Sequence, residues 1–192
     1  MTSFNQELGP LLADEHWQRI GLVNNTASAD LLTPVEQIDP GALLRLYAVN
    51  TAVPVWLMGF IVRRSPPRAA VRIVNVSSGA AVGVFPGLAA YGSSKAALRM
   101  AGMVLGAELA SPLRRLPAPT DVAVLSYEPG TVDTPMQTLA RSQAPESFPS
   151  AQLFQEFAAR GVLVQPEVPS AEMVAFLEAG PQPAFTERRL GA

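Results

Sequence analysis

The chain has 192 residues, of which 48% are hydrophobic and 16% are charged, a balance that fits one globular domain and excludes a disordered chain. The formal net charge is −2, so the chain has no basic excess for neutralising the phosphates of a nucleic acid. The sequence has no cysteine and a single histidine, His16, which excludes a disulfide scaffold, a thiolate metal site, a cysteine nucleophile and a multi-histidine metal site.

The N-terminal region predicts a helix followed by a strand. Residues 3–15 are compatible with a helix that is interrupted near Gly9-Pro10. The apolar run from Ile20 to Val23 ends at Asn24-Asn25, which predicts a buried strand and a turn. No basic stretch precedes an apolar segment at the N-terminus, so we expect a cytoplasmic protein without a secretory leader.

The next segment predicts a long apolar helix. Helical spacing over residues 34–48 continues to about Val62, with a bend expected near Pro54. The uncharged run between Arg45 and Arg63 has 17 residues, whereas a membrane-spanning helix needs about 20. We therefore expect a helix buried within the protein, and no membrane segment.

The rest of the chain continues the alternation of strands and helices. The later elements expected are a strand at 71–76, a helix at 91–110, a strand at 121–127, an irregular or mobile segment at 131–150, helices at about 151–160 and 169–179, and a short strand at 184–185. This alternation predicts an α/β protein with a parallel sheet covered on both faces. Such sheets bind ligands at the carboxyl ends of their strands.

Two side chains at the start of the helix at 91–110 suggest proton-transfer chemistry. Tyr91 and Lys95 are four residues apart, so they share one helix face. A nearby cation lowers the pKa of a phenol, which then can protonate a carbonyl oxygen while hydride reaches the carbon. Ser78 follows the strand at 71–76, and its hydroxyl could orient that carbonyl.

Each of these residues also has an ordinary structural interpretation. Tyr91 and Lys95 could simply be helix residues, and Ser78 could cap the backbone of its loop. The spacing is a weak signal by itself, and the combination of the three positions is what favours chemistry.

Several motifs together resemble the short-chain dehydrogenases/reductases. They are the Asn24-Asn25 turn, Asn50, N-V-S-S-G at 75–79, Y-G-S-S-K at 91–95 and P-G-T-V-D-T at 129–134. The segments at 20–25, 126–137 and 160–164 resemble the sepiapterin reductase branch and its bacterial relatives. The resemblance covers about residues 20–187. It implies a Rossmann-like, doubly wound parallel sheet in a single domain, 1–192, in which 131–165 form the substrate loop or lid.

The resemblance also implies roles for individual residues. Tyr91 is the general acid/base, Ser78 holds the carbonyl, Lys95 lowers the phenol pKa and binds the nicotinamide ribose, and Asn50 holds a water in the proton relay. The cofactor-binding residues implied are Asn25, Tyr91, Lys95, Pro129, Gly130, Val132 and Thr134. Without the resemblance, Asn50 would be a residue that caps or kinks a helix, and Pro129-Gly130 an ordinary turn.

The implied activity is reduction of a small-molecule carbonyl, or oxidation of an alcohol, with NADP(H) preferred, NAD(H) possible and no metal. The implied partner is a second copy of the chain, in a dimer or tetramer. Helices 42–63 and 91–110 would pair with their copies, and the second helix carries small residues that permit close approach: Ala96, Ala97, Ala101, Gly102, Gly106 and Ala107. The alternative is that both helices are buried against the sheet alone.

The sequence departs from the family pattern in two places. Ala27 stands where the family turn N-N-A-G has glycine, which weakens the expected contact with the adenine ribose. No G-x-x-x-G-x-G pyrophosphate turn precedes Asn24, so about 60 residues, or two βαβ units, are expected to be missing. The chain could start downstream of its natural beginning, come from a truncated gene, or be a catalytically silent remnant that only oligomerises with a full-length reductase. By itself, it is expected to bind NADP(H) weakly.

Overall fold

The computed structural model describes residues 2–113 and 119–191. Its strands are β1 (Arg19–Asn24), β2 (Ala70–Val76), β3 (Val122–Glu128) and β4 (Phe185–Arg189). Its α-helices are α1 (Thr2–Leu12), α2 (Pro40–Tyr47), α3 (Val53–Arg64), α4 (Ala89–Ala110), α5 (Pro135–Ser142), α6 (Ala151–Ala159) and α7 (Glu167–Glu178). Shorter helical turns are η1 (Val35–Gln37), η2 (Ala48–Ala52) and η3 (Gly79–Ala81).

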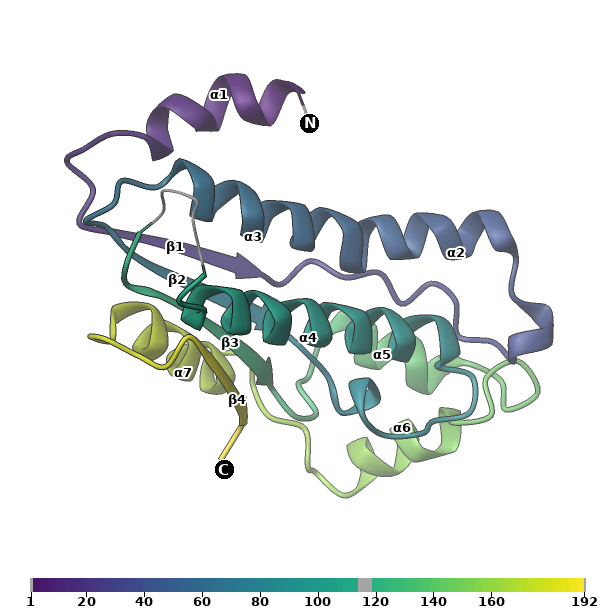
Figure 1. Ribbon diagram of the computed structural model, residues 1–192. Helices are drawn as coiled ribbons and strands as arrows, with labels where there is room; N and C mark the ends of the chain where they lie inside the picture. The colour runs from purple at the N-terminus through teal and green to yellow at the C-terminus, as the bar shows by residue number, and fades with distance from the viewer. Residues whose placement is uncertain (1, 114–118, 192) are drawn as a thin grey trace.

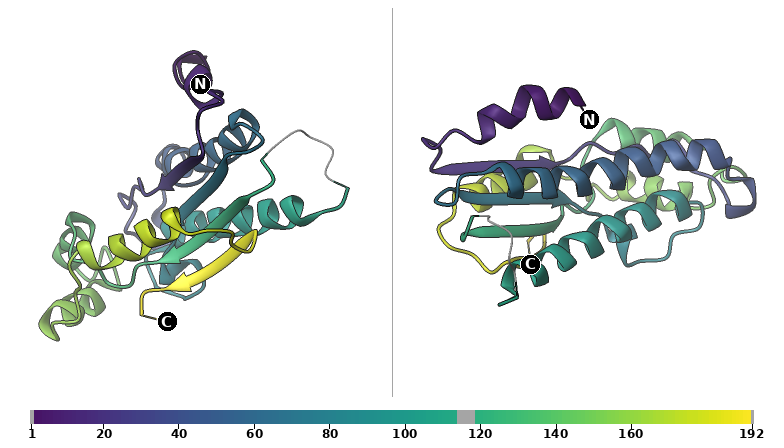
Figure 2. Two further views of the ribbon diagram at one scale, coloured as in Figure 1. Left: turned by 90° about the vertical axis from the view of Figure 1, so that its left-hand side faces the viewer. Right: turned by 45° about the horizontal axis from the view of Figure 1, so that its top comes forward.

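The four strands form one parallel sheet in the order β1-β2-β3-β4. Figures 1 and 2 show α2, α3 and α4 on one face of the sheet and α7 on the other, with α1 outside α3. Apolar side chains of β2 and β3 alternate between the two faces, as in Ile73 toward the α3–α4 side and Val74 toward α7. The expected α/β architecture with a Rossmann-like parallel sheet is therefore confirmed.

The helix at 40–64 begins later than the sequence pattern predicted. Asp39 accepts a hydrogen bond from the Ala42 N–H at 2.7 Å, and Pro40 occupies the first turn, so the helix starts there. In place of a simple bend at Pro54, η2 is a π-helical turn in which the Val53 N–H donates to the Ala48 carbonyl. The widened turn accommodates the proline that follows it.

Residues Pro40–Arg64 are, by length and composition, long and apolar enough to cross a membrane. A core helix can meet the same criterion. Met58, Phe60 and Ile61 of α3 are buried in the cluster between this helix, α4 and the sheet. Only 39% of the apolar stretch is buried, however, so the helix that we expected to be buried is buried only in part.

Two expected irregularities are regular helix in the structure. Helix α1 continues through Pro10, because a proline in a short helix removes one backbone donor without necessarily ending the helix. Within the segment expected to be irregular at 131–150, α5 forms because Thr134 caps its N-terminus and Pro135 supplies a helical φ angle in its first turn. The prolines therefore mark helix starts as well as breaks.

A buried arginine joins the sheet to the end of α7. Arg72 is fully buried in β2 and donates to both carboxylate oxygens of Asp121, at 2.8 and 2.9 Å, and to the Gly180 carbonyl at 2.8 Å. Such a charge is tolerated in the interior because it is paired in bidentate geometry. The VRIVNV pattern alone predicted a strand and gave no sign of this pairing.

Two glycines of α4 allow the helix to lie close to the sheet. A Cβ on Gly106 would stand 2.5 Å from the Phe185 Cβ, and one on Gly102 would stand 3.2 Å from the Asn75 amide. These two residues therefore face the sheet, and they do not contribute to a helix–helix surface as the sequence pattern suggested.

We expect Gly106→Ala to lower the free energy of unfolding by about 1–3 kcal/mol, because the added methyl overpacks the contact with Phe185. Gly59→Ala is the matched control, since its Cβ would meet only the flexible end of Arg63. That change should raise the free energy of unfolding by about 0.5–1 kcal/mol through helix propensity. Urea unfolding of the variants measures both, and equal effects at the two positions would contradict the packing described.

Candidate active site

The start of α4 packs directly against the loop that follows β2. Ser78 caps η3, where its hydroxyl accepts a hydrogen bond from the Ala80 N–H at 3.2 Å. A Cβ on Gly92 would stand only 2.7 Å from the Ala80 carbonyl oxygen. Glycine at this position thus lets the helix approach the loop, and the Ser78 hydroxyl lies near enough to Tyr91 to lower the pKa of its phenol.

Lys95 is the side chain that joins α4 to the end of β2. It is 2% exposed, its ammonium donates to the Val76 carbonyl at 2.7 Å, and its Nζ lies 5.8 Å from the centre of the Tyr91 ring. Burial lowers the pKa of Lys95 to about 8 because the charged form loses solvation. The site therefore still holds a cation at neutral pH.

The phenol of Tyr91 lies in apolar surroundings. It packs against a cluster that includes Leu88 and Phe148, and this burial raises its pKa, an effect that the hydrogen bond from Ser78 partly offsets. The expected lowering of the phenol pKa by Lys95 is thus not what the structure gives: burial of the phenol dominates, and the ammonium is directed to the Val76 carbonyl. Tyr91 is accordingly a protonated donor at neutral pH.

Asn50 lies in the π-helical turn η2 and links three parts of the fold. Its Oδ1 accepts from the Ser28 N–H at 2.8 Å, and its Nδ2 donates to the Ser28 carbonyl at 2.9 Å and to the Ser94 hydroxyl at 3.0 Å. Ser94 in turn donates to the Tyr91 carbonyl at 2.7 Å. One amide hydrogen of Asn50 therefore binds the segment after β1, and the other is linked through Ser94 to the backbone of Tyr91.

The sequence did not single out Ser94 or Ser28. Ser94 lies inside the Y-G-S-S-K motif and is fully buried, so its place in that motif was the available signal. Ser28 contributes only backbone atoms to Asn50. Any residue type can make such contacts, so the sequence could not indicate them.

The remaining expected residues lie at the carboxyl ends of neighbouring strands. Because β1, β2 and β3 are parallel and adjacent, Asn25, Ser78 and Pro129 follow them along one edge of the sheet. Asn25 is exposed there. No hydrogen bond among the described residues joins Asn25 or Thr134 to Tyr91 or Lys95, so these groups share an edge without direct contact.

The turn after β3 has a defined shape. Gly130 has φ of +72°, a conformation that favours glycine. Val132 forms a parallel β-bridge with Val164, so the segment that follows α6 pairs with the turn. The Thr134 hydroxyl caps α5 by accepting from the Gln137 N–H at 3.4 Å.

These residues fit the nicotinamide half of a dinucleotide better than the rest of it. The buried ammonium of Lys95, the Tyr91 hydroxyl and the turn at 129–134 supply polar groups at one strand edge. In contrast, Gly9 lies within α1 and Gly21 within β1, so neither glycine preceding Asn24 forms a phosphate-binding turn. The residues present would hold a nicotinamide and its ribose, with no counterpart for the pyrophosphate.

Comparison with known proteins agrees with this geometry. The sequence model of the family described as short chain dehydrogenase matches residues 12–145. The chain belongs to this family. It is 31% identical over 170 residues to a Bacillus subtilis (strain 168) protein, benzil reductase ((S)-benzoin forming), and 31% identical over 168 residues to sepiapterin reductase from Bos taurus. The expected family and its sepiapterin reductase-like relatives are thus confirmed.

The matches cover most of this chain but a smaller share of the relatives. They include 86% of this chain and 66% of the benzil reductase, and 85% of this chain and 59% of the sepiapterin reductase. The chain therefore spans less than two thirds of the length of these relatives.

Solved structures show the same relationship. The short chain dehydrogenase/reductase YIR035C from Saccharomyces cerevisiae matches with a TM-score of 0.81 at 25% identity, over 100% of this chain and 74% of that one. The angucycline C-6 ketoreductase LanV with bound NADP matches with a TM-score of 0.65 at 25% identity, over 99% of this chain and 66% of that one.

The buried ammonium gives a pH-dependent prediction. The pKa of Lys95 is about 8 in the folded chain and 10.5 ordinarily, so between these values the unfolded state binds more protons and folding stability rises with pH. Between pH 7 and 9.5, the parent should gain about 2 kcal/mol of unfolding free energy relative to Lys95→Met. Urea unfolding of both proteins at the two pH values measures this difference, and identical pH dependences would contradict the burial of a charged Lys95.

Proposed function

We propose that this chain carries the catalytic part of an NADP(H)-dependent reductase that converts a small-molecule carbonyl into an alcohol, or the reverse. The observation that carries the proposal is the arrangement of Ser78, Tyr91 and Lys95, in which a hydroxyl, a partly buried phenol and a buried ammonium lie near the carboxyl end of β2. The kinship with reductases such as the Bacillus subtilis relative supports it.

Each side chain has a separate task in this proposal. Ser78 donates a hydrogen bond that orients the substrate carbonyl, and Tyr91 transfers its phenol proton to the carbonyl oxygen. The raised pKa keeps Tyr91 protonated at neutral pH, as a proton donor must be, and it also makes the phenol a weaker acid. Lys95 stabilises the phenolate that remains. A reduced nicotinamide, when bound, supplies the hydride to the carbonyl carbon.

The surroundings of Tyr91 favour an apolar substrate. Phe85, Met136 of α5 and Phe154 of α6 pack against the same buried cluster as Tyr91, so apolar side chains from the segment 131–165 gather in the region of Tyr91. We therefore propose an aryl or otherwise hydrophobic ketone as substrate. The name of the Bacillus subtilis relative, benzil reductase, denotes a substrate of this kind.

The choice of NADP(H) is supported by LanV, a structural relative that binds NADP. Lys95 and Tyr91 would hold the nicotinamide ribose, while Asn25 and the turn from Pro129 to Thr134 would border the nicotinamide. Among the residues that the structure describes before Asn24, no glycine-rich turn is available for the adenosine phosphates.

The exposed faces of α2–α3 and α4 support a dimer. Leu44, Met100 and Val104 are 73%, 53% and 47% exposed, and α2, α3 and α4 run side by side (Figure 1). We propose that this apolar face pairs with the same face of a second copy. The two helices are only partly buried against their own sheet. The large apolar side chains that they leave exposed favour association with another surface.

The proton donor can be tested in a chain extended at its N-terminus to carry a glycine-rich pyrophosphate turn. In that protein, Tyr91→Phe should lower kcat for NADPH-dependent reduction of benzil by about 100-fold or more, because the phenol supplies the proton. The dissociation constant for NADPH, followed by fluorescence titration, should stay close to the parent value. The 192-residue chain should bind NADPH more weakly than the extended chain by orders of magnitude.

Tyr47→Phe is the matched control, since it removes a hydroxyl outside the site, and it should leave turnover unchanged. Near-parental turnover of Tyr91→Phe would refute the assignment of Tyr91 as the acid. An extended parent that binds NADPH without turning over any carbonyl would favour the silent, oligomerising alternative.

Met100→Glu with Val104→Glu should convert the dimer into a monomer, because charges placed on the apolar face oppose burial. Sedimentation velocity reports the change in mass, and circular dichroism confirms that the fold is kept. Val35→Glu is the control. Val35 is also an exposed apolar residue, but it lies in η1 and not in α2, α3 or α4. A parent that sediments as a monomer would contradict the proposed pairing.

A further inference from the structure

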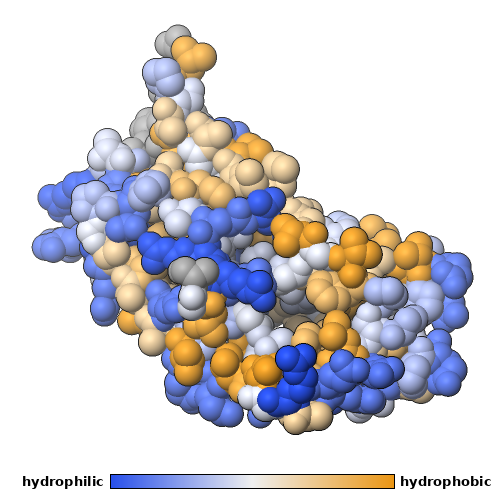
Figure 3. Space-filling model, turned by 90° about the horizontal axis from the view of Figure 1, so that it is seen from below, coloured by the Kyte–Doolittle hydropathy of each residue, from blue (hydrophilic) through white to orange (hydrophobic). Residues whose placement is uncertain are grey.

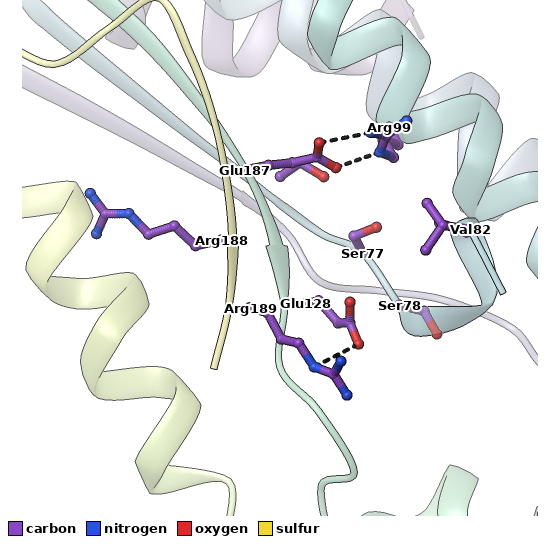
Figure 4. Close-up of a pocket in the computed structure, with 10 residues that line it drawn as sticks. Ser77, Ser78, Val82, Arg99, Glu128, Glu187, Arg188 and Arg189 are labelled. Carbon is purple, nitrogen blue, oxygen red and sulfur yellow. Dashed lines mark hydrogen bonds and ion pairs between the residues drawn. The ribbon is translucent and has the colours of Figure 1, made fainter. Parts of the chain in front are cut away.

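A second polar centre lies on the α4 side of the sheet, apart from Tyr91 and Lys95. It is a cavity of about 190 Å³ between α4, the segment after β2, and the ends of β3 and β4. Figure 3 shows the molecule from below, with charged residues bordering a central hollow, and Figure 4 shows the side chains that line the cavity.

The strand register explains why polar side chains gather here. Ser126 is paired with Glu187, and Glu128 with Arg189. Side chains alternate along a strand, so these four residues project to one face of the sheet, the face covered by α4. The cavity is therefore built by two regular strands and a long helix.

Two ion pairs hold the sides of the cavity. Arg99 on α4 binds both carboxylate oxygens of Glu187 through its Nε and its Nη2, the latter at 2.7 Å, and Arg189 Nε lies 3.3 Å from Glu128 Oε1. Figure 4 shows both pairs facing the space between them. A guanidinium has five N–H donors, so the Arg99 pair leaves three of them for another acceptor, whereas both oxygens of Glu187 are engaged.

The floor of the cavity has an unsatisfied hydroxyl. Ser126 is 1% exposed, and in the part of the chain that the structure describes its Oγ has no hydrogen-bond partner. A buried polar group without a partner costs free energy. A ligand oxygen seated between Ser126 and the guanidinium groups would relieve that cost.

We propose that this cavity binds a small organic acid through its carboxylate. Two arginines, Arg99 and Arg189, point into the cavity, each paired with a glutamate, whereas Arg188 projects to the opposite face of the sheet (Figure 4). The guanidinium N–H groups not used in these pairs, together with the Ser126 hydroxyl, are the donors that a ligand carboxylate would meet. Ala81 and Val82 supply an apolar wall that suits a short carbon chain better than a bare inorganic ion. Of the three residues proposed for the reductase reaction, only Ser78 borders the cavity, and carboxylate binding is measured without turnover, so the proposal does not depend on the reductase activity.

Binding can be measured by isothermal titration of the 192-residue chain with lactate, and with inorganic phosphate in a separate arm, at constant ionic strength set by chloride. Lactate should bind saturably and more tightly than phosphate. Ser126→Ala should keep the melting temperature of the ligand-free chain, because it removes an unpartnered hydroxyl, and should weaken lactate binding at least tenfold. Arg189→Gln should weaken it similarly.

Arg160→Gln is the matched control, since Arg160 is an exposed arginine outside the cavity, and it should leave lactate affinity unchanged. Absence of saturable binding, or equal affinity in Ser126→Ala, Arg189→Gln and Arg160→Gln, would overturn the proposal. Tighter binding of phosphate than of lactate would overturn the choice of a carboxylate. None of these results bears on turnover, so they are distinct from a failure of the proposed reductase activity.

Discussion

The hydrogen bond from the Lys95 ammonium to the Val76 carbonyl fixes the geometry on which the site depends. It joins the first turns of α4 to the last residue of β2 at 2.7 Å, and Ser78 and Tyr91 lie just beyond these two attachment points. The only lysine in the chain is thus buried at the cost of its solvation, and its pKa is lowered to about 8. Gly92 completes the arrangement because it lets the helix meet the Ala80 carbonyl.

Polar groups buried around this bond hold the helix at a fixed rotation. Asn50 binds the backbone of Ser28 and the hydroxyl of Ser94, and Ser94 binds the carbonyl of Tyr91. Fully satisfied networks of this kind rigidify a site, whereas removal of one member leaves the others unpaired in the interior. The π-helical turn is part of this device, since it places Asn50 in the network.

Helix α4 contacts different parts of the fold at successive points along its length. Tyr91 and Lys95 face the proposed reaction centre, and Gly106 faces the sheet. Arg99 reaches Glu187 at the second cavity, while Met100 lies exposed. By the 3.6-residue period, Tyr91, Lys95, Arg99 and Gly106 lie along one stripe of the helix, and Met100 lies on the opposite face.

The sequence by itself determined the alternation of strands and helices and the presence of Tyr91 and Lys95 on one helix face, because periodicity and local spacing are properties of neighbouring residues. It did not determine that Thr134 and Pro135 start a helix inside a proline-rich segment, since the same residues also form turns. Long-range pairings were beyond its reach: Arg72 with Asp121, Asn50 with Ser28, and Arg99 with Glu187 are 49, 22 and 88 residues apart. Only the tertiary structure decided them, as well as the direction of the Tyr91 pKa shift, because burial and partner geometry arise when distant segments pack together.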